Sequence, residues 1–164
     1  MQHLWAPWRS TYINNKEAHR VKCIFCEAPA LGRDEEMLIV HRARFNFVIL
    51  NRYPYTSGHL MVAPYQHAAR LQQVDQQTVE EMMTLARTAE RIIEDVYHPQ
   101  GLNIGMNLGE AAGAGIEQHI HFHVLPRWMG DANFMTTVGD ARVLPELLDV
   151  TFAKLNQAFK LTHA

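Results

Sequence analysis

Three histidines, His119, His121 and His123, alternate with two apolar residues, Ile120 and Phe122. Side chains in a β-strand repeat every second residue, so the three imidazoles are predicted to share one face of a strand. Burying three imidazoles without partners costs desolvation three times over, which makes an accident of packing a poor explanation. Imidazole is a metal ligand, a nucleophile and a proton donor near neutral pH, so a metal site and acid–base or nucleophilic catalysis both stay open.

A loop of small residues precedes the histidines. The segment from Asn107 to Gly115 is rich in glycine and alanine, which allow backbone N–H groups to approach an anion closely. A tight hairpin would explain such a loop equally well. Together with the three histidines and the following Arg127, however, it indicates a pocket that handles phosphate.

Cys23 and Cys26 are the two cysteines of the chain. Their C-x-x-C spacing is typical of a metal site or a redox pair rather than of a structural disulfide. A thioredoxin-like redox role would need a βαβ context that the sequence does not offer, and two ordinary buried thiols are the plain alternative.

The elements that position these residues are predicted from hydrophobic periodicity. Strands are expected over residues 37–41, 45–50, 59–63, 102–108 and 119–125, the last ended by Pro126. A helix is expected over residues 75–97, capped by Asp75, and a second over 143–159. The apolar stripe predicted for the first helix consists of Val79, Met82, Met83, Ala86, Ala89, Ile93 and Val96. The sequence thus predicts an α+β fold with a mainly antiparallel sheet of about five strands and two helices.

Length and composition indicate one globular domain. The 164 residues are 48% hydrophobic and 20% charged, which excludes a disordered or low-complexity chain. A net charge of −2 argues against nucleic-acid binding through bulk charge. Membrane helices need about 18 consecutive apolar residues, which this sequence lacks, and it lacks the features of a signal peptide. We expect a cytoplasmic protein with a single domain over residues 1–164, in which residues 1–36 form an irregular N-terminal arm that carries the cysteine pair.

The segment His-Ile-His-Phe-His-Val-Leu-Pro-Arg, residues 119–127, resembles the signature of the histidine triad (HIT) superfamily of nucleotide hydrolases and transferases. The resemblance covers most of the chain and implies a HIT-like fold. Residues 51–64 resemble the family's substrate-binding strand–turn–strand, and residues 101–109 resemble the segment ahead of the triad. Residues 3–9 and 127–135 are similar to the branch of bacterial diadenosine tetraphosphate phosphorylases.

The resemblance implies roles for individual residues. His121 is the expected nucleophile, with its other ring nitrogen donating to a main-chain carbonyl near His119. His123 is expected to contact the transferred phosphate and the leaving oxygen, with His59 as a supporting fourth histidine. Nucleotide-binding positions are expected at Asn51 (ribose), Asn107 (phosphate chain), Phe25, Phe45 and Leu50 (base), and Gly113 and Gly115 (loop).

Two departures from the family's pattern stand beside this resemblance. Many relatives carry a hydroxyl residue shortly before the triad that helps the leaving group, whereas residues 115–118 here are Gly-Ile-Glu-Gln. The loop between Asn107 and the triad is one residue longer than in some relatives. Leaving-group protonation is then left to the substrate phosphates or to His123.

A subset of HIT proteins joins a C-x-x-C pair to two histidines, one after a Pro-x-x-His turn and one opening the triad. By this resemblance, Cys23, Cys26, His67 and His119 are the expected ligands of a zinc ion. Four such ligands form a closed tetrahedral set, so the zinc is expected to be structural and to fasten the N-terminal arm to the sheet.

The function implied is the cleavage of diadenosine polyphosphates through an adenylylated His121. With orthophosphate as the acceptor, diadenosine tetraphosphate gives ATP and ADP; with water it gives ATP and AMP. The alternatives are a HIT-type hydrolase of dinucleoside polyphosphates or nucleoside phosphoramidates, and a non-catalytic nucleotide-binding protein. A homodimer is expected from the family, and a magnesium or manganese ion accompanying the substrate stays open.

Overall fold

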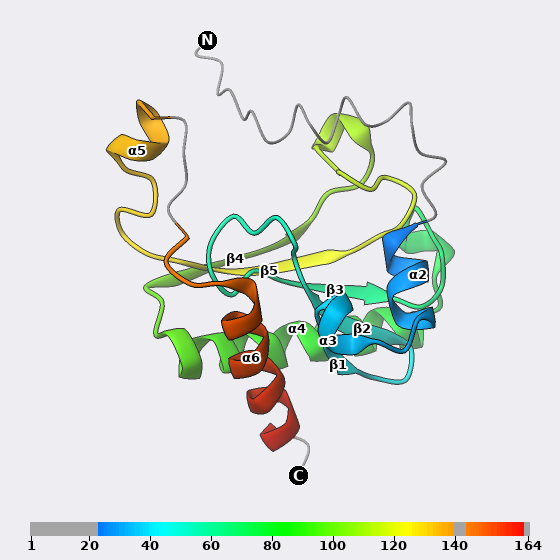
Figure 1. Ribbon diagram of the computed structural model, residues 1–164. Coiled ribbons are helices and arrows are strands. Elements are labelled where there is room, and N and C mark those ends of the chain that lie inside the picture. The colour runs from blue at the N-terminus through cyan, green and yellow to red at the C-terminus, as the bar shows by residue number, and fades with distance from the viewer. Residues whose placement is uncertain (1–22, 140–143, 163–164) are drawn as a thin grey trace.

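A five-stranded sheet forms the centre of the protein (Figure 1). The computed structural model describes residues 23–139 and 144–162. The strand order is β1-β2-β3-β5-β4, and every neighbouring pair is antiparallel. The strands are β1 (Ile39–Arg42), β2 (Asn46–Leu50), β3 (Leu60–Pro64), β4 (Gly101–Met106) and β5 (Phe122–Arg127). The predicted α+β fold with an antiparallel sheet is confirmed.

Helix α4 (Gln76–Tyr97) packs along one face of this sheet (Figure 1). Its period agrees with the prediction, but Met83 is 47% exposed, whereas Leu85 and Ile92 are buried. Asp75 occupies the N-cap position, yet its carboxylate makes no capping hydrogen bond, so the predicted side-chain cap is wrong. The backbone carbonyl of Asp75 instead accepts from the amide of Thr78.

The strand register decides which side chains share the face under α4. Asn46 of β2 donates through Nδ2 to the carbonyl of Thr78 in α4, so the face that carries Asn46 is the helix face. Residues paired across antiparallel strands lie on the same face, and successive residues alternate. Leu50, four residues after Asn46 in β2, shares the helix face and pairs with Leu60. Leu60 pairs in turn with Val124, so Val124 also belongs to the helix face. His123, which pairs with Met61, belongs to the opposite face.

Helix α6 (Leu148–Thr162) covers β1 and α4 with its buried Phe152, Leu155 and Phe159. Asn156 joins the helix to the sheet by donating to the carbonyl of Val40 at 2.9 Å. The helix was predicted over 143–159. Residue 143 lies outside the described residues; residues 144–147 are not helical, and the helix begins at Leu148.

Short helices complete the described structure. They are α2 (Ile24–Ala30), α3 (Asp34–Met37), η2 (Leu71–Gln73), η3 (Glu110–Ala112) and α5 (Phe134–Thr137). The prediction of an irregular arm to residue 36 is wrong for residues 24–36, most of which are helical, and residues 1–22 lie outside the described part. Helix α2 is too short for periodicity to reveal; burial of Phe25 and Ala28 stabilises it. Among the described residues, no helix has the length and apolarity needed to cross a membrane.

Strand β5 begins and ends later than predicted. It starts at Phe122 rather than at His119 and runs through Pro126 to Arg127. It pairs with β3 only over residues 122–124, and beyond Val124 only β4 pairs with it. Pro126 therefore lies where one side of the strand has no ladder partner, a position that tolerates the missing N–H.

Candidate active site

The first two histidines of the triad lie just before β5, with His119 at a bend of the chain. His119 is 0% exposed and His121 is 5% exposed. Between them, Ile120 points into the core and donates its amide to the carbonyl of Ala68 at 2.7 Å. This backbone hydrogen bond ties the segment that carries His119 and His121 to the chain that follows β3.

His121 has one nitrogen committed and one free for chemistry. Its Nδ1 lies 2.9 Å from the backbone carbonyl oxygen of His119. A carbonyl only accepts, so Nδ1 carries the proton and Nε2 presents a lone pair. Burial lowers the pKa of His121, which keeps the ring neutral at pH 7. The ring of Phe25 packs 4.8 Å from that of His121, centroid to centroid, and excludes water from this side.

A chain of hydrogen bonds also assigns the protons of His59 and His123. The backbone amide of Tyr55 donates to Nδ1 of His59 at 3.2 Å, so the proton of His59 is on Nε2. That Nε2 lies 2.9 Å from Nδ1 of His123, which must accept. His123 therefore holds its proton on Nε2, where it is a hydrogen-bond donor with a fixed direction.

Both of these histidines are neutral at physiological pH. Burial and the neighbouring His123 lower the pKa of His59 to about 3. Burial and the neighbouring His121 lower the pKa of His123 to about 4. His123 thus acts as a neutral donor and not as an imidazolium acid.

Asn51 lies at the same end of the sheet as these histidines. Its Oδ1 accepts from the amide of Tyr53 at 2.9 Å, which shapes the turn after β2. Its Nδ2 lies 3.4 Å from Nδ1 of His59. The structure therefore brings Asn51 and His59 together.

The glycine-rich loop starts next to the nucleophile. Met106, the last residue of β4, pairs with Phe122, so Asn107 follows directly beside the triad. Nδ2 of Asn107 lies 3.9 Å from the point that a Cβ on Gly113 would occupy. Gly113 has φ +84°, a conformation that glycine adopts without strain. The predicted loop residues, Gly115 included, thus lie in the connection between β4 and His119 that contains η3.

Phe45 is not brought to this site. It precedes β2, where its amide donates to Glu81 and its carbonyl accepts from the amide of Tyr65. Asn51 lies six residues further along the same strand, a distance of about 20 Å at the usual rise. Phe45 is therefore at the opposite end of the sheet from His59.

Leu50 is on the wrong face to contact a nucleotide held by the histidines. It pairs with Leu60 on the helix face and is 2% exposed. Its neighbour Ile49 pairs with Met61 and shares the face of His123. The two-residue alternation with Asn51, the residue after β2, was a sequence signal that places Ile49 rather than Leu50 on this face.

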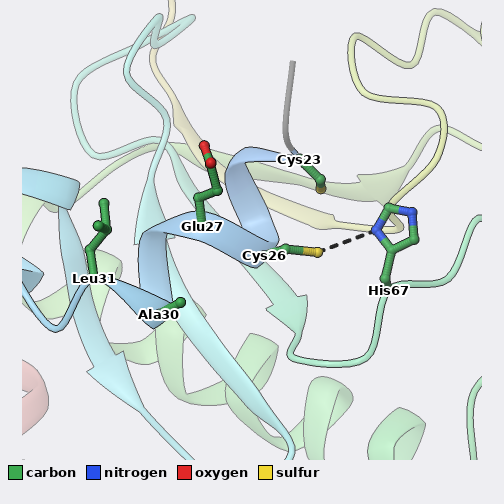
Figure 2. Close-up of a pocket in the computed structure, with 6 residues that line it drawn as sticks. All are labelled: Cys23, Cys26, Glu27, Ala30, Leu31 and His67. Atoms are coloured by element: carbon green, nitrogen blue, oxygen red, sulfur yellow. Dashed lines mark hydrogen bonds between the residues drawn. The ribbon is translucent and has the colours of Figure 1, made fainter. Parts of the chain in front are cut away.

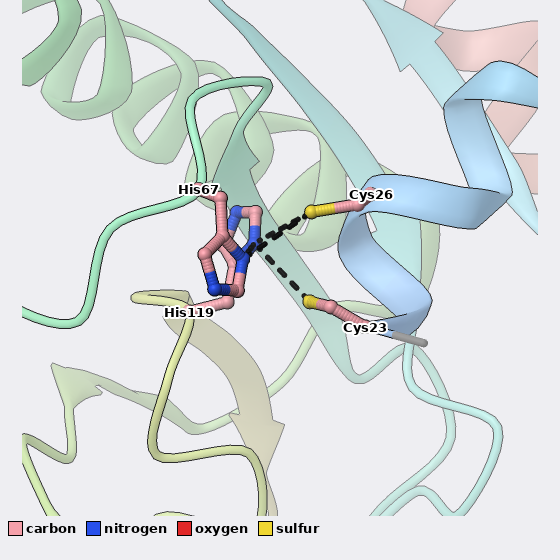
Figure 3. Close-up of side chains that lie close together, drawn as sticks. All are labelled: Cys23, Cys26, His67 and His119. Carbon is pink, nitrogen blue, oxygen red and sulfur yellow. Dashed lines mark hydrogen bonds between the residues drawn. The ribbon is translucent and has the colours of Figure 1, made fainter. Parts of the chain in front are cut away.

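The side chain of His119 forms a cluster with those of Cys23, Cys26 and His67 (Figure 3). Nε2 of His119 lies 2.8 Å from the carbonyl of Pro64, so this nitrogen carries the proton and Nδ1 is a free ligand atom. That Nδ1 lies 3.3 Å from Sγ of Cys23, 3.5 Å from Sγ of Cys26 and 3.3 Å from Nδ1 of His67.

These spacings fit a tetrahedral metal site. Zinc bond lengths place two ligand nitrogens about 3.3 Å apart and a nitrogen and a sulfur about 3.6 Å apart. All four ligand atoms lie within 4.8 Å of one another. Burial and the adjacent Cys23 raise the pKa of Cys26 to about 11, but a bound metal ion deprotonates a coordinating thiol. Cys23, Cys26, His67 and His119 can therefore hold one divalent ion.

The metal site would fasten three separate segments. Cys23 and Cys26 belong to the start of α2, His67 follows β3, and His119 precedes β5. Figure 2 shows Cys26 directed toward His67 beside an open hollow, which Glu27 and other residues of α2 line. A metal there would join α2 to the sheet end that carries the triad.

Comparison with known proteins places the chain in a family. The HIT domain family matches residues 34–129. The chain is 41% identical over 155 residues to a Mycobacterium tuberculosis protein named AP-4-A phosphorylase, with 90% of this chain and 79% of that protein covered. A zinc-bound histidine triad family protein from Mycobacterium smegmatis superposes with a TM-score of 0.70 at 27% identity, covering 87% of this chain and 96% of that one.

A hypothetical histidine triad nucleotide-binding protein from Sulfolobus tokodaii shares the fold with a TM-score of 0.68 at 24% identity, over 85% of this chain and 93% of that one. The family match, the 41% identity and the histidine geometry agree. The chain belongs to the histidine triad (HIT) family.

Proposed function

We propose that this protein cleaves diadenosine tetraphosphate through a nucleotidyl intermediate on His121, with orthophosphate as the acceptor and ATP and ADP as products. The observation that carries the proposal is the neutral His121 ring, whose Nδ1 proton is engaged by the carbonyl of His119. The M. tuberculosis relative named AP-4-A phosphorylase supports the substrate and the reaction. Membership of the HIT family also supports the more general conclusion that this protein is an enzyme acting on dinucleoside polyphosphates.

In the first step, Nε2 of His121 attacks the α-phosphorus and a P–N bond forms. The P–O bond to the rest of the substrate breaks, and its electron pair leaves on an oxygen of ATP. A polyphosphate oxygen is a stable anion at pH 7 and needs no proton, so this step requires no hydroxyl in the Gly-Ile-Glu-Gln segment at residues 115–118. The Nε2 proton of His123 donates to an oxygen of the transferred phosphate.

Asn51 is proposed to hold the ribose and Asn107 the phosphate chain, with Phe25 lining the base side of the site. The metal would be a structural Zn²⁺ bound by Cys23, Cys26, His67 and His119. It supplies a cross-link that holds the backbone around His119, and it takes no part in the transfer.

A second candidate is hydrolysis, in which water intercepts the intermediate and AMP replaces ADP. A Schizosaccharomyces pombe protein named bis(5'-nucleosyl)-tetraphosphatase is 28% identical over 57% of this chain, and this similarity supports hydrolysis as the alternative reaction.

The test is to incubate the protein with diadenosine tetraphosphate, with and without orthophosphate, and to separate the products by anion-exchange chromatography. ATP and ADP formed only with phosphate support the phosphorylase. ATP and AMP formed in both reactions would make the protein a hydrolase. No turnover would refute the proposal and favour a phosphoramidate substrate or a nucleotide-binding role without catalysis.

The protein is further proposed to be a cytoplasmic homodimer. Strand β4 ends the sheet, and its Ile104 is 42% exposed, which suits contact with a second copy. Light scattering should then give twice the chain mass of 18.8 kDa. A mass equal to one chain would refute the dimer.

A further inference from the structure

An arginine outside the triad lies against the glycine-rich loop. A Cβ built on Gly109 would meet Nη2 of Arg70 at 3.4 Å, Nη1 at 3.6 Å and Cζ at 3.9 Å. The whole guanidinium thus lies along the backbone of Gly109, whose φ is +92°. A side chain at position 109 would fill the space between the loop and this cation.

The guanidinium of Arg70 retains most of its donors. Within the described residues it makes one hydrogen bond, from Nη1 to the carbonyl of Ala69 at 3.2 Å. Arg33, Arg42 and Arg127 each have a carboxylate partner within 3 Å, and no such pair is found for Arg70 in this part of the chain. An arginine with five donors and one weak partner beside a glycine loop is suited to bind an anion.

Two backbone connections place Arg70 near the nucleophile. The carbonyl of Ala68, two residues before Arg70, accepts from the amide of Ile120, the residue next to His121. The loop itself starts after Met106, which pairs with Phe122 on the other side of His121. Arg70 and Gly109 therefore belong to the two segments that flank the triad.

We propose that Arg70 and the loop from Gly109 to Gly115 form the subsite for the phosphates beyond the α-phosphate. This subsite rests on the proposed nucleotidyl transfer. In the first step it holds the phosphates of the leaving ATP. In the second step it holds the orthophosphate, because the acceptor must attack the phosphorus opposite His121, where the leaving group departed.

The second step balances without any further reactant. An oxygen of HPO₄²⁻ forms a bond to the α-phosphorus, and the P–N bond to His121 breaks. The electron pair of that bond returns to Nε2, which restores the neutral imidazole with its proton still on Nδ1. The proton brought in by orthophosphate stays on the β-phosphate of ADP or passes to solvent. Arg70 would position the acceptor by two parallel hydrogen bonds.

The test compares Arg70→Gln and Arg70→Lys with Arg91→Gln, an exposed arginine on α4, which packs on the opposite face of the sheet. In Arg70→Gln, the KM for orthophosphate is expected to rise about tenfold or more, as for loss of a charge-assisted hydrogen bond. The lysine variant should recover part of this loss, and Arg91→Gln should resemble the wild type. An unchanged KM for phosphate in Arg70→Gln would overturn the subsite.

A binding measurement separates this subsite from the proposed function. The His121→Asn variant forms no intermediate. In this background, Arg70→Gln should weaken the binding of ATP about tenfold and leave the binding of AMP unchanged, because AMP has no phosphate beyond the first. Equal weakening of both nucleotides, or of neither, would refute the subsite whatever the enzyme's products are. The wild type could prove to be a hydrolase while Arg70→Gln weakens the binding of ATP alone. That result would refute the phosphorylase reaction and support the subsite as the one that binds the leaving group.

Discussion

The backbone carbonyl of His119 accepts the Nδ1 proton of His121 at 2.9 Å, while Nδ1 of the His119 ring lies 3.3 Å from Sγ of Cys23. One residue thus orients the candidate nucleophile through its main chain and belongs to the candidate metal centre through its ring. The amide of Ile120, bonded to Ala68, holds the peptide between them. Any movement of the metal site is expected to reach Nε2 of His121 through this short connection.

Replacing His121 by alanine should abolish turnover while leaving nucleotide binding largely intact, because it removes the Nε2 lone pair that forms the proposed intermediate. Loss of a nucleophile lowers kcat by about 10³-fold or more. The measurement is single-turnover product formation together with the Kd of AMP. Wild-type protein quenched in alkali after reaction with α-labelled substrate should retain label that is released by acid, as a phosphohistidine does. Turnover that survived His121→Ala would refute the nucleophile assignment.

Removing the metal should lower both stability and kcat. Chelation, or Cys26→Ser, takes away the cross-link between α2 and His119, and a loss of a few kcal/mol corresponds to a fall of about 10 °C in Tm. Bound metal is measured by mass spectrometry, and cobalt substitution should give the intense visible bands of a tetrahedral thiolate site. Wild-type protein with no bound metal and no response to chelators would contradict the metal centre.

His59→Ala should lower kcat with little change in the KM for the dinucleotide. His59 donates to Nδ1 of His123, so its removal frees His123 to place its proton on either nitrogen. The expected loss is about 10- to 100-fold in kcat, the usual effect of a misdirected proton donor. His59→Gln, whose amide can donate to the same nitrogen, should restore part of the activity. Equal losses in both variants would argue against a tautomer-directing role.

Folding stability should fall as the pH is lowered from about 6.5 to 4. His59 and His123 have pKa values near 3 and 4 in the folded protein, against about 6.5 in the unfolded chain. Between these values the unfolded chain binds protons that the folded protein does not, so the free energy of unfolding decreases with falling pH. Urea unfolding of wild type and His59→Gln at several pH values measures this. The slope with pH should be smaller in the variant, and parallel slopes would contradict the burial of a neutral His59.

Gly58→Ala should destabilise the protein by about 2–3 kcal/mol. Gly58 has φ +82°, and a Cβ there would lie 3.0 Å from Cε2 of Tyr97 and 3.4 Å from Cγ of Pro126. Tyr97 is held in place by its hydroxyl, which donates to Glu146 at 2.7 Å. Gly32→Ala is the matched control, because Gly32 also has a positive φ of +64° but open space around it. That control should cost about 1 kcal/mol; equal losses in the two variants would show that the contact with Tyr97 carries no cost.

Residue types and local spacings indicated which residues of this protein are candidates for chemistry. Alternation of three histidines indicated an extended segment with a functional face, and the apolar period of residues 75–97 predicted α4 closely. The C-x-x-C pair indicated a metal or a redox role. By themselves these patterns left the partners of the cysteines open. The family resemblance pointed to His67 and His119, and the structure brings both within ligand distance.

Only the tertiary structure shows on which face of the sheet a side chain lies, which ring nitrogen of a histidine carries the proton, and which residues of distant segments are neighbours. Leu50 and Ile49 are both apolar and adjacent in sequence, and only the pairing of β2 with β3 shows that Ile49 shares the face of His123. Proton positions on the histidines depend on backbone groups of Tyr55, Pro64 and His119, which no spacing rule supplies. Arg70 meets Gly109 across 39 positions of sequence for the same reason. Periodicity is a property of one segment, whereas register, tautomer and contact are set by hydrogen bonds between segments that are distant in the sequence.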